Sequence, residues 1–214
     1  DHSGLVWARG KQISRQSDWI GLSAHFENIN LERLEMYCGS RGYLGISPIE
    51  NNRVNVTGLF KKSTFRKFSG INLLLAYLNF NNCDDVFKRL NKGRYVDNSF
   101  TAITGFSFGQ QRKNGFSIGD NSLLIPPFSG NGMSMALEAA AQASKYLIKY
   151  SNKRISWDEA CRRHARYEKE SFRLRMGVST CLHPFLFSPF GLSAMRVLSR
   201  IGFLPVTRLY NALR

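Results

Sequence analysis

Alternating apolar and polar residues dominate the first quarter of the chain. This period-two pattern predicts strands because neighbouring side chains of a strand point to opposite faces of a sheet. The segments that show it are Trp19–Ile29, Leu34–Cys38, Tyr43–Ile49 and Arg53–Phe60. Asn51 and Asn52 stand between the last two segments, and asparagine tolerates the positive φ of a tight hairpin turn. We therefore expect an antiparallel meander.

Longer apolar runs follow and predict helices. Asp84 is expected to cap a short helix, and Ser156 with Glu159 forms a capping box at the start of a long one. The predicted helices are Asn72–Phe80, Asp84–Leu90, Met133–Tyr150 and about Ser156 to Thr180. Between the second and third, Phe100–Phe108 and Gly115–Gly119 are predicted as strands that flank a basic turn, Gln110–Asn114.

The composition agrees with a globular protein. The 214 residues include 43% hydrophobic and 13% aromatic residues, which is enough for a buried core. The sequence shows no CxxC and no histidine at metal-ligand spacing, and no signal peptide is visible after Asp1. Its four cysteines, Cys38, Cys83, Cys161 and Cys181, lie far apart. We expect no metal site, free thiols and a reducing, cytoplasmic compartment.

The positive charge concentrates at the carboxy-terminal end. The formal net charge is +15, and no acidic residue follows Glu170. Phe190, Val197 and Ile201 share one face of a predicted amphipathic helix, with Arg196 and Arg200 off that face. A basic amphipathic tail suits a membrane surface, an acidic partner or an acidic segment outside these residues. The alternative is that its apolar face packs on the protein's own surface. Nucleic acid also suits the charge, but no zinc-finger or RNA-recognition motif accompanies it, so no specific nucleic acid is expected.

The stretch Gly119–Ala141 carries the clearest chemical signal. A short apolar strand ends at Gly119-Asp120, Pro126-Pro127 follow, and Gly130-Asn131-Gly132 precede a helix. A helix that begins behind such a turn directs its free N–H groups and positive dipole end toward an anion or an electron-rich ring. The stretch is not a GxGxxG fingerprint, because the third glycine position is Met135.

This constellation resembles the second flavin-binding motif of FAD-dependent oxidoreductases, the group that contains aromatic hydroxylases and geranylgeranyl reductases. The resemblance implies that Asp120 binds the ribityl chain of FAD. It also implies that the helix amino terminus faces the pyrimidine edge of the flavin. The cofactor-binding residues implied are Gly119, Asp120, Pro127, Gly130, Asn131, Gly132 and Met133.

A second resemblance lies upstream. Tyr43–Pro48 and the strand from Arg53 are similar to the YxWxFP segment and following strand of geranylgeranyl reductases, although Gly45 and Ser47 replace larger residues. A substrate pocket against the sheet is guessed to include Tyr43, Ile46 and Leu59. Asn121-Ser122-Leu123 stand where the hydroxylases commonly have Ala-Ala-His, which makes the transfer of hydroxylase chemistry less safe.

The resemblance implies an α+β chain that forms part of an α/β FAD-binding fold. Residues 1–108 would be a mainly antiparallel substrate-binding domain with inserted helices, 109–150 a flavin-binding strand, turn and helix, and 151–214 a helical region. The family's amino-terminal dinucleotide-binding unit is missing from this sequence. Either these residues are the carboxy-terminal part of a longer flavoprotein, or they form a truncated relative that has lost catalysis.

The function implied is that of an FAD-dependent reductase or monooxygenase that uses NADH or NADPH and acts on a lipophilic or aromatic small molecule. Since the flavin carries such chemistry, no catalytic acid or base is named. His25, His164 and His183 are expected to be structural or surface residues. The alternative is a non-catalytic, basic module, derived from such a flavoprotein, that binds a membrane or a partner. Peripheral membrane contact through the tail is compatible with both.

Overall fold

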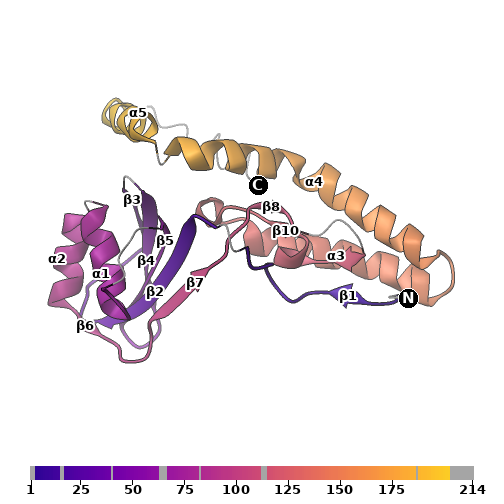
Figure 1. The fold of residues 1–214 in the computed structure, drawn as a ribbon, viewed down its shortest axis with the longest axis horizontal. Coiled ribbons are helices and arrows are strands. Elements are labelled where there is room, and N and C mark those ends of the chain that lie inside the picture. The colour runs from indigo at the N-terminus through magenta and orange to yellow at the C-terminus, as the bar shows by residue number, and fades with distance from the viewer. Residues whose placement is uncertain are drawn as a thin grey trace. The chain divides into compact units, whose positions relative to one another are not determined.

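The computed structural model describes residues 3–14, 17–39, 41–62, 67–81, 83–111, 115–186 and 188–202 (Figure 1). The chain divides into two compact units. We call the first the sheet unit, which contains Arg15–Phe106 and Phe185–Gly202. The second, which we call the helical unit, contains the described residues up to Ser14 together with Ser107–Pro184. The functional roles assigned to residues 1–108, 109–150 and 151–214 stay predictions.

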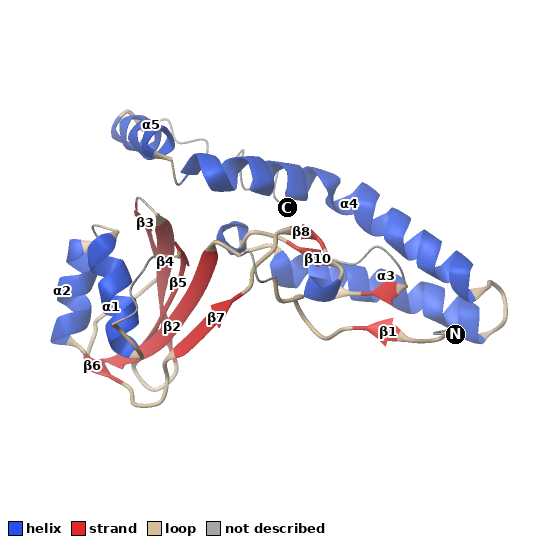
Figure 2. Ribbon diagram, viewed as in Figure 1, coloured by secondary structure: helices blue, strands red, loops and turns tan. Residues whose placement is uncertain are grey.

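The sheet unit is built on an antiparallel sheet in the order β3-β4-β5-β2-β6 (Figure 2). Its long strands alternate buried and more exposed side chains, as at Leu22, Ala24 and Phe26 on β2. The strands are β2 (Trp19–Glu27), β3 (Glu35–Gly39), β4 (Gly42–Ile49), β5 (Arg53–Lys61), β6 (Arg94–Tyr95) and β7 (Thr101–Thr104), which also pairs with β2. All four strands predicted before Lys61 are present.

The pairing of these strands corrects the predicted meander. β3, β4 and β5 are joined in sequence as hairpins, but β2 pairs with β5 along nine residues and not with β3. Alternation fixes which face a side chain occupies, whereas the choice of neighbour depends on which strand best covers the core. The Asn51-Asn52 turn is confirmed, with φ angles of 60° and 54°.

Two helices cover one face of this sheet (Figure 1). They are α1 (Ile71–Phe80) and α2 (Asp84–Lys92), and they pack Leu74, Tyr77 and Leu90 against the buried strand residues. The predicted cap is wrong, because Cys83 precedes α2 and Asp84 is its first helical residue. Asp84 can still stabilise the helix through the dipole. The amphipathic helix predicted near the end of the chain is α5 (Pro189–Arg200).

The predicted strand Phe100–Phe108 is too long. Only Thr101–Thr104 pairs with β2, because Gly105 takes a φ of 82° and turns the chain. Gln110, predicted in a basic turn, instead forms β8 with Gly109, whereas residues 112–114 of that turn lie outside the described residues. Arg208 and Arg214 of the basic tail also lie outside them.

The helical unit places short strands beside two long helices. β1 (Val6–Trp7) pairs in parallel with β9 (Phe116–Ser117), and β8 (Gly109–Gln110) pairs with β10 (Leu123–Leu124). The helices are α3 (Gly132–Ser151) and α4 (Trp157–Leu186). Their apolar faces meet in clusters around Ile125, Met135 and Phe172 and around Phe116, Ala143 and Ala160. These clusters hold the Gly119–Gly132 segment against both helices.

The start of α4 agrees with the predicted capping box in one of its two bonds. Ser156 Oγ accepts the Glu159 N–H at 3.2 Å, whereas the Glu159 carboxylate binds Arg162 and Arg163. The helix continues past its predicted end at Thr180 and includes Pro184. Among the described residues, no helix combines the length and apolar character that crossing a membrane requires.

Candidate functional site

The segment from β9 to α3 changes direction at two glycines in the left-handed region. Gly119 has a φ of 58° and begins the turn two residues after the end of β9, and Gly130 has a φ of 67° just before α3. A Cβ on Gly130 would meet no atom within 4 Å, so its backbone conformation, and not space, requires glycine. A Cβ on Gly119 would lie 3.7 Å from the Ala136 side chain of α3. The first turn therefore packs closely against the helix.

The structure brings the seven predicted cofactor-binding residues into this one segment of the helical unit. Gly119 and Asp120 lie in a 3₁₀ turn, Gly119–Asn121, and Pro127 begins a second one, Pro127–Ser129. Gly130 ends that second turn, and the next three residues begin α3: Asn131 as its N-cap, then Gly132 and Met133. Whether these residues bind a cofactor stays a prediction.

The amino terminus of α3 is uncapped. Asn131 makes no side-chain capping bond, and the first turn contains no acidic residue. The bond from Met135 N–H to the Asn131 carbonyl oxygen, at 2.9 Å, leaves the N–H groups of Gly132, Met133 and Ser134 without a partner inside the helix. Together with the helix dipole, these groups favour an electronegative ligand atom.

Asp120 lies at the surface of the Gly119–Asn121 turn. Loss of hydration raises the pKa of its carboxyl, and the positive charge of Lys11 opposes this rise. The next residue, Asn121, is buried and donates from Nδ2 to the Gly10 carbonyl oxygen at 3.1 Å. The segment after β1 thus supports the turn and supplies a cation near its carboxylate.

Two apolar side chains lie uncovered beside this terminus. Met133 is 81% exposed and Leu137, one helical turn later, is 72% exposed. By contrast, Met135 and Ala139 of the same helix are buried against β10 and α4. The exposed pair offers an apolar surface next to N–H donors that have no partner inside the helix, a combination suited to a flat heteroaromatic ring.

Sequence reasoning missed a polar cluster behind the turn, formed by Ser122, His164 and Glu168. Ser122 Oγ donates to Glu168 Oε2, and His164 Nε2 lies 2.9 Å from the Ser117 carbonyl oxygen and 3.5 Å from Glu168 Oε1. His164 and Glu168 occur at the same four-residue spacing as buried Ala160 and Phe172. Polar residues on that core-facing stripe were the available signal.

Burial sets the protonation of this cluster. It lowers the pKa of His164, against the effect of the bond to Ser117, and it raises the pKa of Glu168 to about 7, which the bond from Ser122 opposes. Because a carbonyl oxygen can only accept, His164 Nε2 carries the proton. His164 also stacks on Phe116, with ring centroids 4.5 Å apart. His183, packed near Phe108 and Phe128, has its pKa lowered to about 4 by burial.

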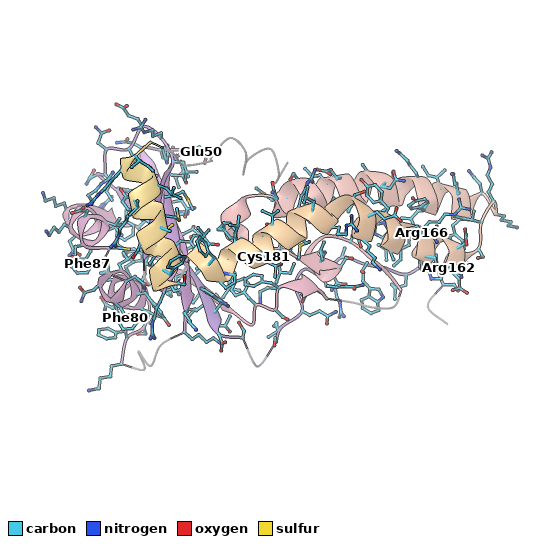
Figure 3. The ribbon with its side chains drawn as sticks, turned by 90° about the horizontal axis from the view of Figure 1, so that it is seen from above. Glu50, Phe80, Phe87, Arg162, Arg166 and Cys181 are labelled. Atoms are coloured by element: carbon cyan, nitrogen blue, oxygen red, sulfur yellow. The ribbon has the colours of Figure 1, made fainter. Side chains whose placement is uncertain are left out.

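An open cleft with a volume of about 990 Å³ lies within the helical unit along α4. Ser122, His164 and Glu168 line it together with the basic residues Arg166, Lys169 and Arg173. Figure 3 labels Arg162 and Arg166 on the first part of this helix. The polar cluster therefore lies between the Gly119 turn and a basic cleft.

The structure does not bring the three guessed substrate residues together. Tyr43 pairs with Leu59 in the sheet register, so their side chains share one face. Ile46 belongs to the opposite face and is fully buried in the core beneath α1 and α2. The expectation that Tyr43 and Leu59 line a pocket stays a prediction.

The histidines and cysteines form no further cluster in the described part of the chain. His25 lies in β2, where its backbone N–H donates to Ser99 Oγ at 3.0 Å. No group of three histidine, cysteine or acidic residues among the described residues is placed to hold a metal ion. The four cysteines are free, and burial raises the pKa of Cys83 to about 11. A neutral, buried thiol of this kind is unreactive.

No protein-family model matches the sequence, and no curated protein matches it. Solved structures, in contrast, resemble the fold. The flavin-dependent brominase Bmp2 matches with a TM-score of 0.71 and 14% identity, over 97% of this chain and 57% of its own. PqsL, a probable FAD-dependent monooxygenase from Pseudomonas aeruginosa, matches with a TM-score of 0.62 and 16% identity, over 88% and 57%.

A third similar structure is the myxobacterial chondrochloren halogenase CndH, with a TM-score of 0.62 and 15% identity, over 78% of this chain and 44% of its own. The chain thus spans little more than half the length of Bmp2 and PqsL. At such low identity the likeness concerns the fold. The predicted fold class is confirmed: these residues have a mixed α and β fold like that of part of the FAD-dependent halogenases and monooxygenases.

Proposed function

We propose that these residues form the flavin-facing part of an FAD-dependent oxidoreductase. The observation that carries the proposal is the uncapped amino terminus of α3 beside Asp120 and the exposed Met133. The fold that the chain shares with FAD-dependent halogenases and monooxygenases supports it. Neither the geometry at the start of α3 nor the similarity of fold depends on high sequence identity.

The residues present fit one part of FAD. The Asp120 carboxylate would accept hydrogen bonds from ribityl hydroxyls. The N–H groups at the start of α3 would stabilise negative charge on the pyrimidine edge, and Met133 and Leu137 would exclude water from the ring. The sequence contains no GxGxxG for the ADP moiety, so these residues would hold only the isoalloxazine and ribityl portions.

FAD, when bound, supplies the redox chemistry, which passes electrons from NADH or NADPH to a substrate double bond or to oxygen. The chain's own residues orient the cofactor and tune its charge. We propose a lipophilic or aromatic small molecule as the substrate, with Tyr43 and Leu59 of the sheet unit at its site. Monooxygenase chemistry accords with the similar structures, and reductase chemistry with the resemblance to geranylgeranyl reductases.

Replacement of Asp120 tests the proposal. We expect Asp120→Ala to weaken FAD binding roughly tenfold or more, because ribityl hydroxyls would lose charge-assisted hydrogen bonds worth about 1.5–3 kcal/mol. The dissociation constant is measured by titrating the purified protein with FAD and monitoring the quenching of flavin fluorescence.

Asp158→Ala is the matched control, because Asp158 is an exposed aspartate in the first turn of a different helix, α4. It should leave FAD binding unchanged. The proposal fails if the natural protein binds no FAD under these conditions, or if Asp120→Ala and Asp158→Ala bind it equally well.

A further inference from the structure

The Gly119–Asn121 turn is held from behind at both ends by one helix. Before the turn, the Ser117 carbonyl oxygen accepts a hydrogen bond from His164 Nε2 at 2.9 Å. After the turn, the Ser122 hydroxyl donates to the Glu168 carboxyl group. His164 and Glu168 lie one helical turn apart on α4, and their nearest side-chain atoms are 3.5 Å apart. The two contacts therefore act from one rigid element.

The backbone of the turn transmits this restraint to Asp120. The Ser122 N–H bonds to the Gly119 carbonyl oxygen at 2.9 Å and closes the turn around Asp120. The Gln111 N–H bonds to the Ser122 carbonyl oxygen at 2.8 Å, so Ser122 is anchored on three sides. A displacement of Ser122 would move the neighbouring carboxylate with it.

The cluster is costly as a purely structural device. Ser122 is 5% exposed, and the His164 and Glu168 side chains are 3% and 11% exposed. His164 Nδ1 has no hydrogen-bond partner within the described part of the chain. Burying such polar groups costs free energy that burying apolar side chains of similar size would not cost. In return, hydrogen bonds fix the direction in which the bonded groups approach each other.

We infer that Ser122, His164 and Glu168 are positioning residues that hold the Asp120 carboxylate in place for the cofactor. This inference rests on the proposed FAD site at Asp120. The cluster would act through Asp120 and would not contact FAD itself. Its removal should therefore weaken FAD binding only when the Asp120 carboxylate is present.

A double-mutant cycle tests this dependence. The FAD dissociation constant is measured for the natural protein, Ser122→Ala, Asp120→Ala and the double variant. We expect Ser122→Ala to weaken binding roughly 3- to 10-fold in the natural background, the loss of one directional hydrogen bond, and to change nothing when Asp120 is alanine. Equal loss in both backgrounds would overturn the inference, as would no loss in the natural protein.

Variants of Glu168 provide a second measurement. Glu168→Leu removes the acceptor for Ser122 while filling the space, and Glu168→Gln keeps an acceptor oxygen. We expect Leu to weaken FAD binding as Ser122→Ala does, and Gln to retain more of it. Ser144→Ala, which removes an exposed hydroxyl from α3, is the matched control. Equal FAD binding by the Leu and Gln variants would contradict the inference.

The outcomes separate the two claims. If the natural protein binds no FAD, or if Asp120→Ala binds it normally, the proposed function fails and the inference falls with it. If Asp120→Ala loses FAD while Ser122→Ala and Glu168→Leu do not, the proposed function stands and the positioning role is wrong.

Discussion

Glu168 is an acid whose surroundings favour its neutral form. Its carboxyl group contacts the Ser122 hydroxyl and the His164 imidazole. Glu168 also lines a small cavity together with the apolar residues Met135, Ala136 and Ala139 of α3. The charged residues of the cleft that Glu168 lines are Arg166, Lys169, Glu170 and Arg173, all on its own helix. Burial raises the pKa of Glu168 from 4.5 to about 7, and the hydrogen bond from Ser122 opposes this rise.

This pKa predicts a stability that falls as pH rises. The folded state holds the Glu168 proton more tightly than the unfolded state does. The free energy of unfolding therefore falls by on the order of 3 kcal/mol as the pH rises from 4.5 to 7. Glu168→Gln should remove this loss. We expect the variant to be more stable than the natural protein at pH 8 but not at pH 4.5, as measured by urea unfolding.

Glu170→Gln is the control, because it makes the same charge change at an exposed position of α4. It should follow the natural protein at both pH values. Parallel curves for Glu168→Gln and the natural protein would contradict the assignment of Glu168.

At the scale of residues, the local sequence pattern identified Asp120 as a candidate site residue but did not identify Glu168. Asp120 belongs to a contiguous run of glycines and prolines whose spacing is visible in the sequence. Glu168 reaches Ser122 across 46 positions, and that contact depends on how α4 packs against the turn. Ser122 was noticed only as a departure from the hydroxylase pattern.

At the scale of elements, the β4–β5 hairpin depends on two consecutive residues with positive φ. Asn51 and Asn52 adopt φ angles of 60° and 54°, which match the twist of the paired strands. Asparagine accepts this conformation, whereas β-branched residues do so at a cost.

Asn51→Val should therefore lower the free energy of unfolding by about 1–2 kcal/mol. Urea unfolding measures the change. Asn91→Val, at an exposed site near the end of α2, is the control and should cost only a few tenths of a kcal/mol. A loss at Asn51 no larger than that at Asn91 would show that the turn geometry does not limit stability.

The same hairpin shows what periodicity can and cannot predict. Periodicity and turn residues located all four long strands and the β4–β5 turn. They did not reveal that β2 lies beside β5, since any strand with the same alternation could occupy that edge. The end of the strand at Thr104 was missed because Gly105 can take either sign of φ.

At the scale of the whole molecule, the basic charge is accompanied by exposed apolar residues. On α5, Phe190 and Val197 are 75% and 58% exposed, and Ile201, the residue after the helix, is 67% exposed. The three recur at helical spacing beside Arg196 and Arg200. We propose peripheral contact of this face with anionic membranes. An enzyme acting on lipophilic molecules would benefit from such contact.

Vesicle flotation tests this contact. We expect the protein to float with vesicles that contain phosphatidylserine more than with neutral vesicles, and the double variant Phe190→Ser, Val197→Ser to lose this binding. Leu174→Ser, at a 64% exposed site on α4, is the matched control. Equal flotation with both lipids would count against electrostatic attraction. Unchanged flotation of the double variant would show that the α5 face does not make the contact.

The unequal exposure of Met133 and Met135 has a chemical consequence. Only the first of these thioethers is open to peroxide, because 81% of Met133 is exposed but only 4% of Met135. Peptide mass spectrometry should find sulfoxide at Met133 first, and saturating FAD should slow that oxidation without changing the rate at Met135. Equal rates at Met133 with and without FAD would show that the cofactor does not cover it. The helix thus carries a reporter and its internal standard two residues apart.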